Sequence, residues 1–104
     1  MEPRVVDRPD ASRYEILAGA DDTGTAGFAA YTLAEGEIAF THTETAPAFA
    51  GQGLGGLLAR GALDDARARG LDVLPYCPFI RGWIAKHPEY VDLVPEGRRA
   101  RFDL

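Results

Sequence analysis

The sequence predicts an α+β fold (α/β by a looser convention), in which a mixed, mainly antiparallel sheet packs against a central helix and one or two C-terminal helices follow. Apolar and polar residues alternate along residues 4–43, as in strands that are buried on one face. The period then changes to that of an amphipathic helix over residues 52–70. The chain has 104 residues, of which 46% are apolar and 26% charged. We therefore expect a single domain over residues 1–104.

Four strands are expected in the first half of the chain. They are predicted at residues 4–8, 12–18, 25–33 and 37–43. The acidic, glycine-containing segment 19–24 is typical of a hairpin loop, and residues 34–36 predict a tight connection. On the fourth strand, Ile38, Phe40 and His42 are expected to share one face, because alternate residues of a strand point the same way.

The second half is expected to contain two helices and a fifth strand. From residue 52 to 70, small and apolar residues fall on one arc of a helix, namely Leu54, Leu57, Leu58, Gly61, Ala62 and Ala66. Residues 71–76 predict a short strand parallel to the fourth, since a helix connects the two. Pro78 fits the first turn of the second helix, which Pro88 limits. The arginine-containing tail beyond Val94 is expected to be loosely ordered.

Charge and cysteine content restrict the classes of function. Sixteen acidic and eleven basic residues give a net charge of −5, which argues against a nucleic-acid partner. The single cysteine, Cys77, excludes an internal disulfide and favours a reducing compartment. The sequence contains neither the apolar core of a signal peptide nor an apolar run near the ~18 residues of a membrane span. We expect a soluble cytoplasmic protein that binds no membrane, and the sequence leaves its oligomeric state open.

A glycine-rich segment, GQGLGG at residues 51–56, joins the fourth strand to the first helix. Glycines let backbone N–H groups approach a ligand closely, and the helix dipole favours an anion such as a diphosphate. The spacing also fits the dinucleotide-binding pattern G-x-G-x-x-G. However, the preceding strand belongs to a meander and no acidic residue ends the next strand, so we reject that interpretation. The alternative that these glycines only allow a tight turn and close helix packing stays open.

Two motifs resemble the GNAT acetyltransferase superfamily. The run T-H-T-E-x-x-P-x-x-x-G-Q-G-L-G-x-L-L, from Thr41 to Leu58, is similar to the acetyl-CoA-binding segment of that superfamily. The run P-Y-C-P-F-I-x-x-W-x-x-x-H-P-E-Y, from Pro75 to Tyr90, resembles the compact GNAT-like subfamily in which a cysteine follows the fifth strand. The Arg or Gln that opens the superfamily motif is replaced by Ala50, so a side-chain contribution is absent there.

The resemblance implies that acetyl-CoA binds as a cosubstrate in a V-shaped split between the fourth and fifth strands. Its diphosphate would accept hydrogen bonds from the glycine turn, whose residues are Gly51, Gln52, Gly53, Leu54, Gly55 and Gly56. Its pantetheine arm would pair with the edge of the fourth strand near Thr43 and Thr45. The implied activity is N-acetyl transfer from acetyl-CoA to a primary amine, either of a small molecule or of a protein lysine. The alternatives are a CoA- or acyl-CoA-binding module with little turnover and a purely structural partner domain.

Three side chains are the main candidates for the chemistry. Cys77 is expected at the start of the second helix, where a thiolate is stabilised; it is a candidate nucleophile or general acid, or else a small buried residue. His42 and Glu44 end the fourth strand and are candidate bases for the incoming amine, and a regular strand would point both to one side. Tyr76 and Tyr90 are further candidate acids, with packing as the ordinary alternative. The two histidines and one cysteine show no metal-ligand spacing, so no metal is expected.

Overall fold

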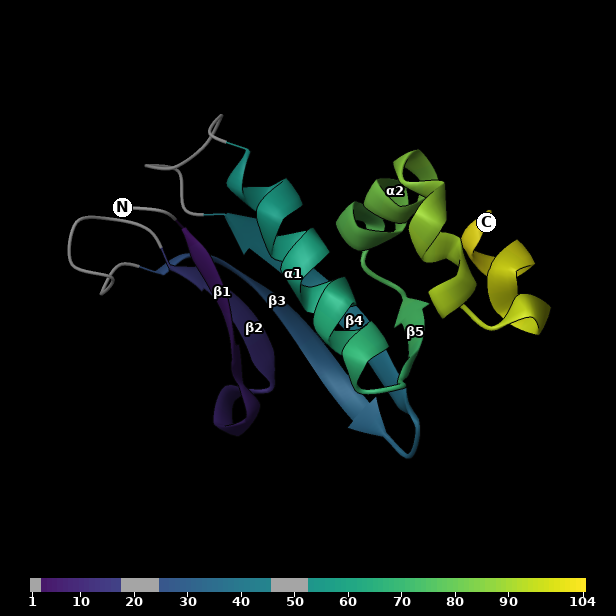
Figure 1. Ribbon diagram of the computed structural model, residues 1–104, viewed down its shortest axis with the longest axis horizontal. Coiled ribbons are helices and arrows are strands. Elements are labelled where there is room, and N and C mark those ends of the chain that lie inside the picture. Colours follow the sequence, from purple (N-terminus) through teal and green to yellow (C-terminus); the bar gives the residue numbers. More distant parts are fainter. Residues whose placement is uncertain (1–2, 18–24, 46–52) are drawn as a thin grey trace.

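In the residues that this computed structural model describes, five strands form one sheet. Their order in the sheet, β1-β2-β3-β4-β5, follows the order of the chain (Figure 1). The structure describes residues 3–17, 25–45 and 53–104. The strands are β1 (Arg4–Arg8), β2 (Arg13–Leu17), β3 (Thr25–Ala34), β4 (Glu37–Thr45) and β5 (Asp72–Pro75). Strands β1 to β4 are antiparallel neighbours, and β5 lies parallel to β4. The predicted fold class is confirmed, and the predicted strands differ only at their ends. The predicted loop at 19–24 lies outside the described residues.

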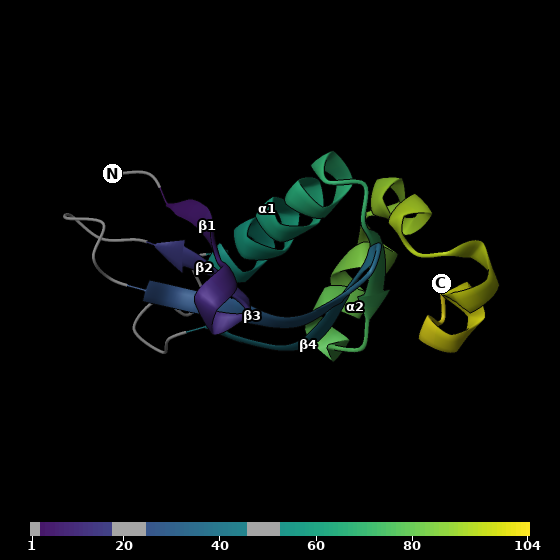
Figure 2. The same ribbon diagram turned by 90° about the horizontal axis from the view of Figure 1, so that it is seen from below.

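Two α-helices follow the meander in the described part of the chain. Helix α1 (Leu54–Ala68) crosses one face of the sheet, and α2 (Pro78–Lys86) follows β5 at the far end of the molecule (Figures 1 and 2). Short 3₁₀ helices complete the fold: η1 (Pro9–Ala11), η3 (Pro88–Leu93) and η4 (Glu96–Phe102). Within the described ranges, no helix is long and apolar enough to cross a membrane.

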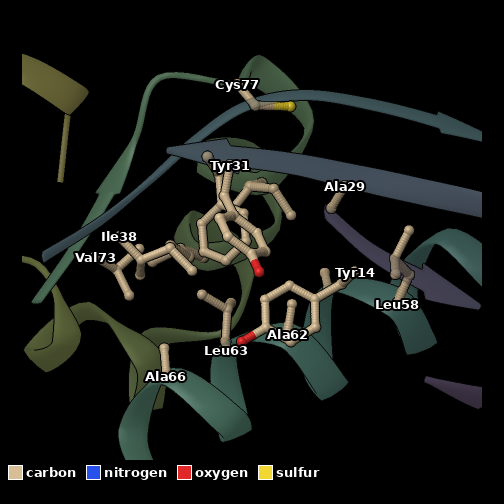
Figure 3. Close-up of a cluster of buried hydrophobic side chains, with 14 of the residues drawn as sticks. Tyr14, Ala29, Tyr31, Ile38, Leu58, Ala62, Leu63, Ala66, Val73 and Cys77 are labelled. Atoms are coloured by element: carbon tan, nitrogen blue, oxygen red, sulfur yellow. The ribbon is translucent and has the colours of Figure 1, made fainter. Parts of the chain in front are cut away.

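The core lies between α1 and the sheet (Figure 3). Helix α1 buries Leu54, Leu58, Ala59, Ala62, Leu63 and Ala66. Strands β2 to β5 contribute Tyr14, Ile16, Ala29, Tyr31, Ile38, Phe40 and Val73 to the same cluster. The expectation that Leu57 belongs to the buried arc is wrong, because its side chain is 45% exposed. At 100° per residue, Leu57 lies nearly opposite the centre of the arc that α1 buries.

A polar network joins the core to the ends of α1 and β1. The Tyr14 hydroxyl donates a hydrogen bond to Asp65 on α1, and the Tyr31 hydroxyl donates one to Asp7 on β1. Arg69 contacts Asp7, Asp65 and the Tyr14 hydroxyl at 3.3–3.4 Å. Burial and the hydrogen bond to Asp7 raise the pKa of Tyr31 to about 12. Burial also raises the pKa of Tyr14, so both hydroxyls stay protonated near neutral pH. They link β2 to α1 and β3 to β1.

The C-terminal segment is ordered, which corrects the expectation of a loose tail beyond Val94. Helix η4 buries Phe102, which is 2% exposed and packs edge-on against the ring of Tyr76 at 5.2 Å. Arg98 adds an ion pair with Glu37 at the start of β4, with a separation of 2.8 Å. One aromatic anchor and one ion pair thus attach the tail to the ends of β5 and β4.

Candidate functional site

Strands β4 and β5 diverge partway along their length. Their paired residues end at Phe40 and Pro75, and the Cys77 N–H then donates a hydrogen bond to the Phe40 carbonyl at 2.8 Å. Beyond that point the chain turns into α2, whereas β4 continues to Thr45. Within the described part of the chain, residues 41–45 pair only with β3, so their other edge is open. The divergence forms a V whose arms are the end of β4 and the start of α2.

A β-bulge lies at the point where the two strands separate. Tyr31 pairs with Phe40, but the preceding residue, Ala30, pairs with His42, so Thr41 is an extra residue in β4. A bulge shifts the alternation of side chains by one position. The expectation that His42 shares a face with Ile38 and Phe40 is therefore wrong. His42 points to the face opposite α1, and Thr43 takes the orientation that Phe40 has before the bulge.

His42 and Glu44 are brought together on the open face of the sheet. The His42 Nε2 and Glu44 Oε2 atoms are 3.1 Å apart, and each side chain is 61% exposed. The His42 ring lies against Phe28 of β3, with ring centroids 6.0 Å apart. The two residues do point to one side, as a regular stretch of strand requires. A carboxylate beside an imidazole orients the ring and can assist it in accepting a proton.

Cys77 occupies the N-cap of α2, as Pro78 in the first turn predicts. Its side chain is 2% exposed, and its Sγ atom lies 3.2 Å from the Thr43 hydroxyl oxygen. Figure 3 shows Cys77 at the margin of the core cluster, away from the Tyr14 and Tyr31 rings. The thiol thus joins the start of α2 to the bulged part of β4, across the base of the V. Sequence reasoning named Thr43 and Cys77 separately and had no signal for their contact.

The glycine turn reaches the described residues at Gly53, while Gly51 and Gln52 lie outside them. Gly53 is the N-cap of α1 and has φ +73°, a left-handed conformation that favours glycine. A Cβ built at Gly53 meets no described atom within 4 Å. The backbone conformation, not close packing, therefore requires glycine here, and no described atom fills the space beside Gly53.

The first turn of α1 presents backbone donors. The first intrahelical hydrogen bond runs from the Leu57 N–H to the Gly53 carbonyl at 3.3 Å. The N–H groups of residues 54–56 come before it and so have no carbonyl partner within α1. Leu54 is 3% exposed and offers only its backbone to a ligand. A Cβ at Gly55 would lie 2.9 Å from the ring of Phe79 on α2. Close packing of α1 against α2 therefore explains the glycine at position 55. This agrees, at this position, with the alternative that the glycines allow close helix packing.

The contacts of the two candidate tyrosines are with groups other than His42 and Glu44. The Tyr90 hydroxyl donates to Asp64 at 2.7 Å and accepts from Arg60 at 3.2 Å, so it joins η3 to α1. Burial, followed by the hydrogen bond to Asp64, raises the pKa of Tyr90. Tyr76 is 46% exposed and packs against the tail. The contacts of Tyr76 and of Tyr90 are thus those of residues that pack elements of the fold together.

Most of the chain is similar to a known protein family. Residues 13–93 match a family model described as GCN5-related N-acetyl-transferase. No curated protein matches the chain. Among the residues that the structure describes, no group of three or more His, Cys, Asp or Glu side chains could hold a metal ion.

Proposed function

The chain belongs to the family of GCN5-related N-acetyltransferases, and on this premise we propose that it transfers the acetyl group of acetyl-CoA to a primary amine. Family membership supports a general acetyltransferase role. The observation that carries the finer proposal is the V between β4 and β5, with the glycine start of α1 beside it. It combines an open strand edge with backbone N–H donors for a diphosphate.

The V and the start of α1 beside it would hold acetyl-CoA in three places. The N–H groups of residues 53–56, together with Gly51 and Gln52, would donate to the diphosphate. The open edge of β4 at Thr43 and Thr45 would pair with the amide groups of the pantetheine arm. The thioester would then lie near Cys77, because the Cys77 sulfur already contacts Thr43. Net charge does not oppose this placement, since backbone donors bind anions locally.

The His42–Glu44 pair would act as the base in transfer. The uncharged amine attacks the thioester carbonyl, so a C–N bond forms and the C–S bond breaks. The pair takes the proton that the amine loses, and the CoA sulfur leaves with a proton. The Cys77 thiol, at the base of the V, would donate that second proton. Its thiolate would then regain a proton from solvent, to which the His42–Glu44 pair releases the first. Because Cys77 is 2% exposed, its burial favours direct transfer over a relay through an acetylated cysteine.

Amine-dependent release of free CoA from acetyl-CoA tests this function. Wild-type protein should release CoA with at least one member of a panel of small amines and lysine peptides. Glu44→Gln and His42→Ala should each lower kcat by about 10²-fold or more, the contribution usual for a positioned base. Glu35→Gln, an exposed carboxylate in the β3–β4 turn, is the matched control and should keep full activity. Tight acetyl-CoA binding without amine-dependent release would instead favour a CoA-binding module.

A further inference from the structure

The face of the sheet opposite α1 brings charged and aromatic side chains of three strands together. Tyr14 on β2 and Tyr31 on β3 point to the core, so the residues that alternate with them point to this other face. The strand register arranges these residues in two rows that cross β2, β3 and β4. The first row is Glu15, Phe28 and Glu44, and the second is Arg13, Ala30 and His42. The candidate base pair therefore forms the β4 side of a larger group.

The ring of Phe28 contacts a residue on each side of it. The Arg13 guanidinium carbon lies 4.6 Å from the ring centroid, and the centroid of the His42 ring lies 6.0 Å from it. Both neighbours belong to the second row, diagonal to Phe28, at a spacing that an aromatic side chain can bridge. In that row, Ala30 contributes only a methyl group, which leaves room for the ring. Phe28 thus lies between Arg13 on β2 and His42 on β4.

A buried carboxylate holds Arg13 in place beside this ring. The Arg13 Nε donates a hydrogen bond to Glu15 Oε2 at 2.7 Å, and a second guanidinium nitrogen lies 2.6 Å from the same oxygen. The Arg8 Nε donates to the other carboxylate oxygen at 3.2 Å. Glu15 is 7% exposed, so water competes little for these bonds. The guanidinium is therefore fixed in position, and its attraction to the aromatic face restrains the ring of Phe28 in turn.

Phe28 also supports the exposed His42–Glu44 pair. Each side chain of the pair is 61% exposed. Within the described residues, the ion-pair and ring partners of His42 are Glu44 and Phe28. An exposed ion pair loses side-chain entropy when its members are held in one geometry, so it is weak on its own. An adjacent aromatic ring excludes other rotamers of the imidazole and keeps water from one side of the pair.

We propose that Phe28 is a positioning residue for the His42–Glu44 pair, with its own ring held by Arg13 and Glu15. The inference rests on the proposed function, in which that pair takes the proton that the amine loses. Phe28 keeps the imidazole in its reactive orientation before the amine arrives. It belongs neither to the start of α1 nor to the open edge of β4, where acetyl-CoA would bind. Its loss should therefore affect the transfer step and not the binding of acetyl-CoA.

Steady-state kinetics of three variants test this role. Phe28→Leu keeps an apolar side chain but removes the ring. It should lower kcat by about tenfold and leave the KM for acetyl-CoA unchanged, since a misplacement of about 1 Å can cost up to about 10²-fold in rate. Phe28→Tyr keeps the ring and should retain nearly the full kcat. Leu33→Ala, which shortens an apolar side chain of β3 that is 46% exposed, is the matched control and should keep the wild-type kcat. A wild-type kcat in Phe28→Leu, or an equal loss in Leu33→Ala, would overturn the proposal.

A nuclear magnetic resonance measurement without substrate tests the contact itself. The chain has two histidines, His42 and His87, and the spectrum of His42→Ala assigns their ring signals. Wild-type protein should show a nuclear Overhauser cross-peak between the His42 and Phe28 rings. Phe28→Leu should shift the His42 ring signals and leave those of His87, whose ring stacks on Trp83, in place. Absence of the cross-peak in wild-type protein would overturn the proposal even if a variant failed to fold.

The two measurements together distinguish the failure of this inference from that of the proposed function. If wild-type protein releases CoA with an amine but Phe28→Leu is unchanged in kcat, the positioning role is refuted and the proposed function stands. If wild-type protein releases no CoA with any amine, the proposed function is refuted and the positioning role with it. The contact between Phe28 and His42 would then be a structural one only.

Discussion

Replacing Gly53 by alanine separates the role of the glycine turn in ligand binding from its role in folding. Gly53 has φ +73°, and a Cβ there meets no described atom within 4 Å. The protein itself therefore leaves room for the methyl group. The left-handed conformation still costs an alanine about 1–2 kcal/mol. We expect Gly53→Ala to fold, with a melting temperature lower by roughly 4–8 °C for each kcal/mol lost.

Gly70 supplies a matched control at the other end of α1. Its φ is +69°, and a Cβ there also meets no described atom within 4 Å. Gly70→Ala should therefore lose a similar free energy of unfolding, and any difference between the two variants in ligand binding reflects the site. At Gly53 the methyl group would stand between the backbone N–H groups and the diphosphate. Loss of one charge-assisted hydrogen bond, about 1.5–3 kcal/mol, weakens binding by about tenfold to a hundredfold.

Thermal unfolding and calorimetric titration with CoA measure both effects. The expected result is similar stability for the two variants, unchanged CoA affinity for Gly70→Ala and a loss of tenfold or more for Gly53→Ala. Equal CoA affinity in the two variants would refute the reasoning. The start of α1 would then have a structural role only.

Three further predictions concern stability, pH dependence and mechanism. Phe102→Ala should lower the free energy of unfolding, measured in urea, by about 3 kcal/mol, because the ring is 2% exposed. A loss under about 1 kcal/mol would instead support a loosely ordered tail. Burial raises the pKa of Glu15, but hydrogen bonds from Arg13 and Arg8 outweigh it and lower the pKa below 4.5. The ionised Glu15 therefore stabilises the folded protein above pH 4.5, and this contribution to the free energy of unfolding is lost as the pH falls. Glu15→Gln should make the free energy of unfolding less dependent on pH in the acid range, and an unchanged dependence would contradict the account. Mass spectrometry after incubation with acetyl-CoA alone should show no stoichiometric acetyl group on Cys77; an adduct that an amine discharges would instead establish a covalent relay.

The order of the elements could be predicted from the sequence because each has its own hydrophobic period. The alternation of apolar and polar residues no longer predicts side-chain orientation after Phe40. The run Thr41–Thr45 is polar throughout, so no apolar residue marks which side faces the core. The bulge at Thr41 falls within that run, so the orientation of His42 could not be predicted. The helical period likewise places Leu57 near an apolar arc, but only the packing of α1 decides which arc is buried.

Contacts between distant segments account for the rest of what the sequence did not predict. The N-cap position of Cys77 followed from Pro78, whereas its contact with Thr43 depends on how β4 and β5 diverge. The order of the tail depends on Phe102, whose partner, Tyr76, lies on another element. The contact between Phe79 and Gly55 has the same origin, because the two residues meet only after α1 and α2 pack against each other.

A crystal structure of the protein with CoA tests the central claim most directly. The account predicts that the diphosphate lies on the N–H groups at the start of α1, within hydrogen-bond distance of residues 53–56. It also predicts that the pantetheine arm follows the open edge of β4 and that the CoA sulfur lies between β4 and Cys77. A diphosphate bound away from the start of α1, or a thiol outside the V between β4 and β5, would contradict it.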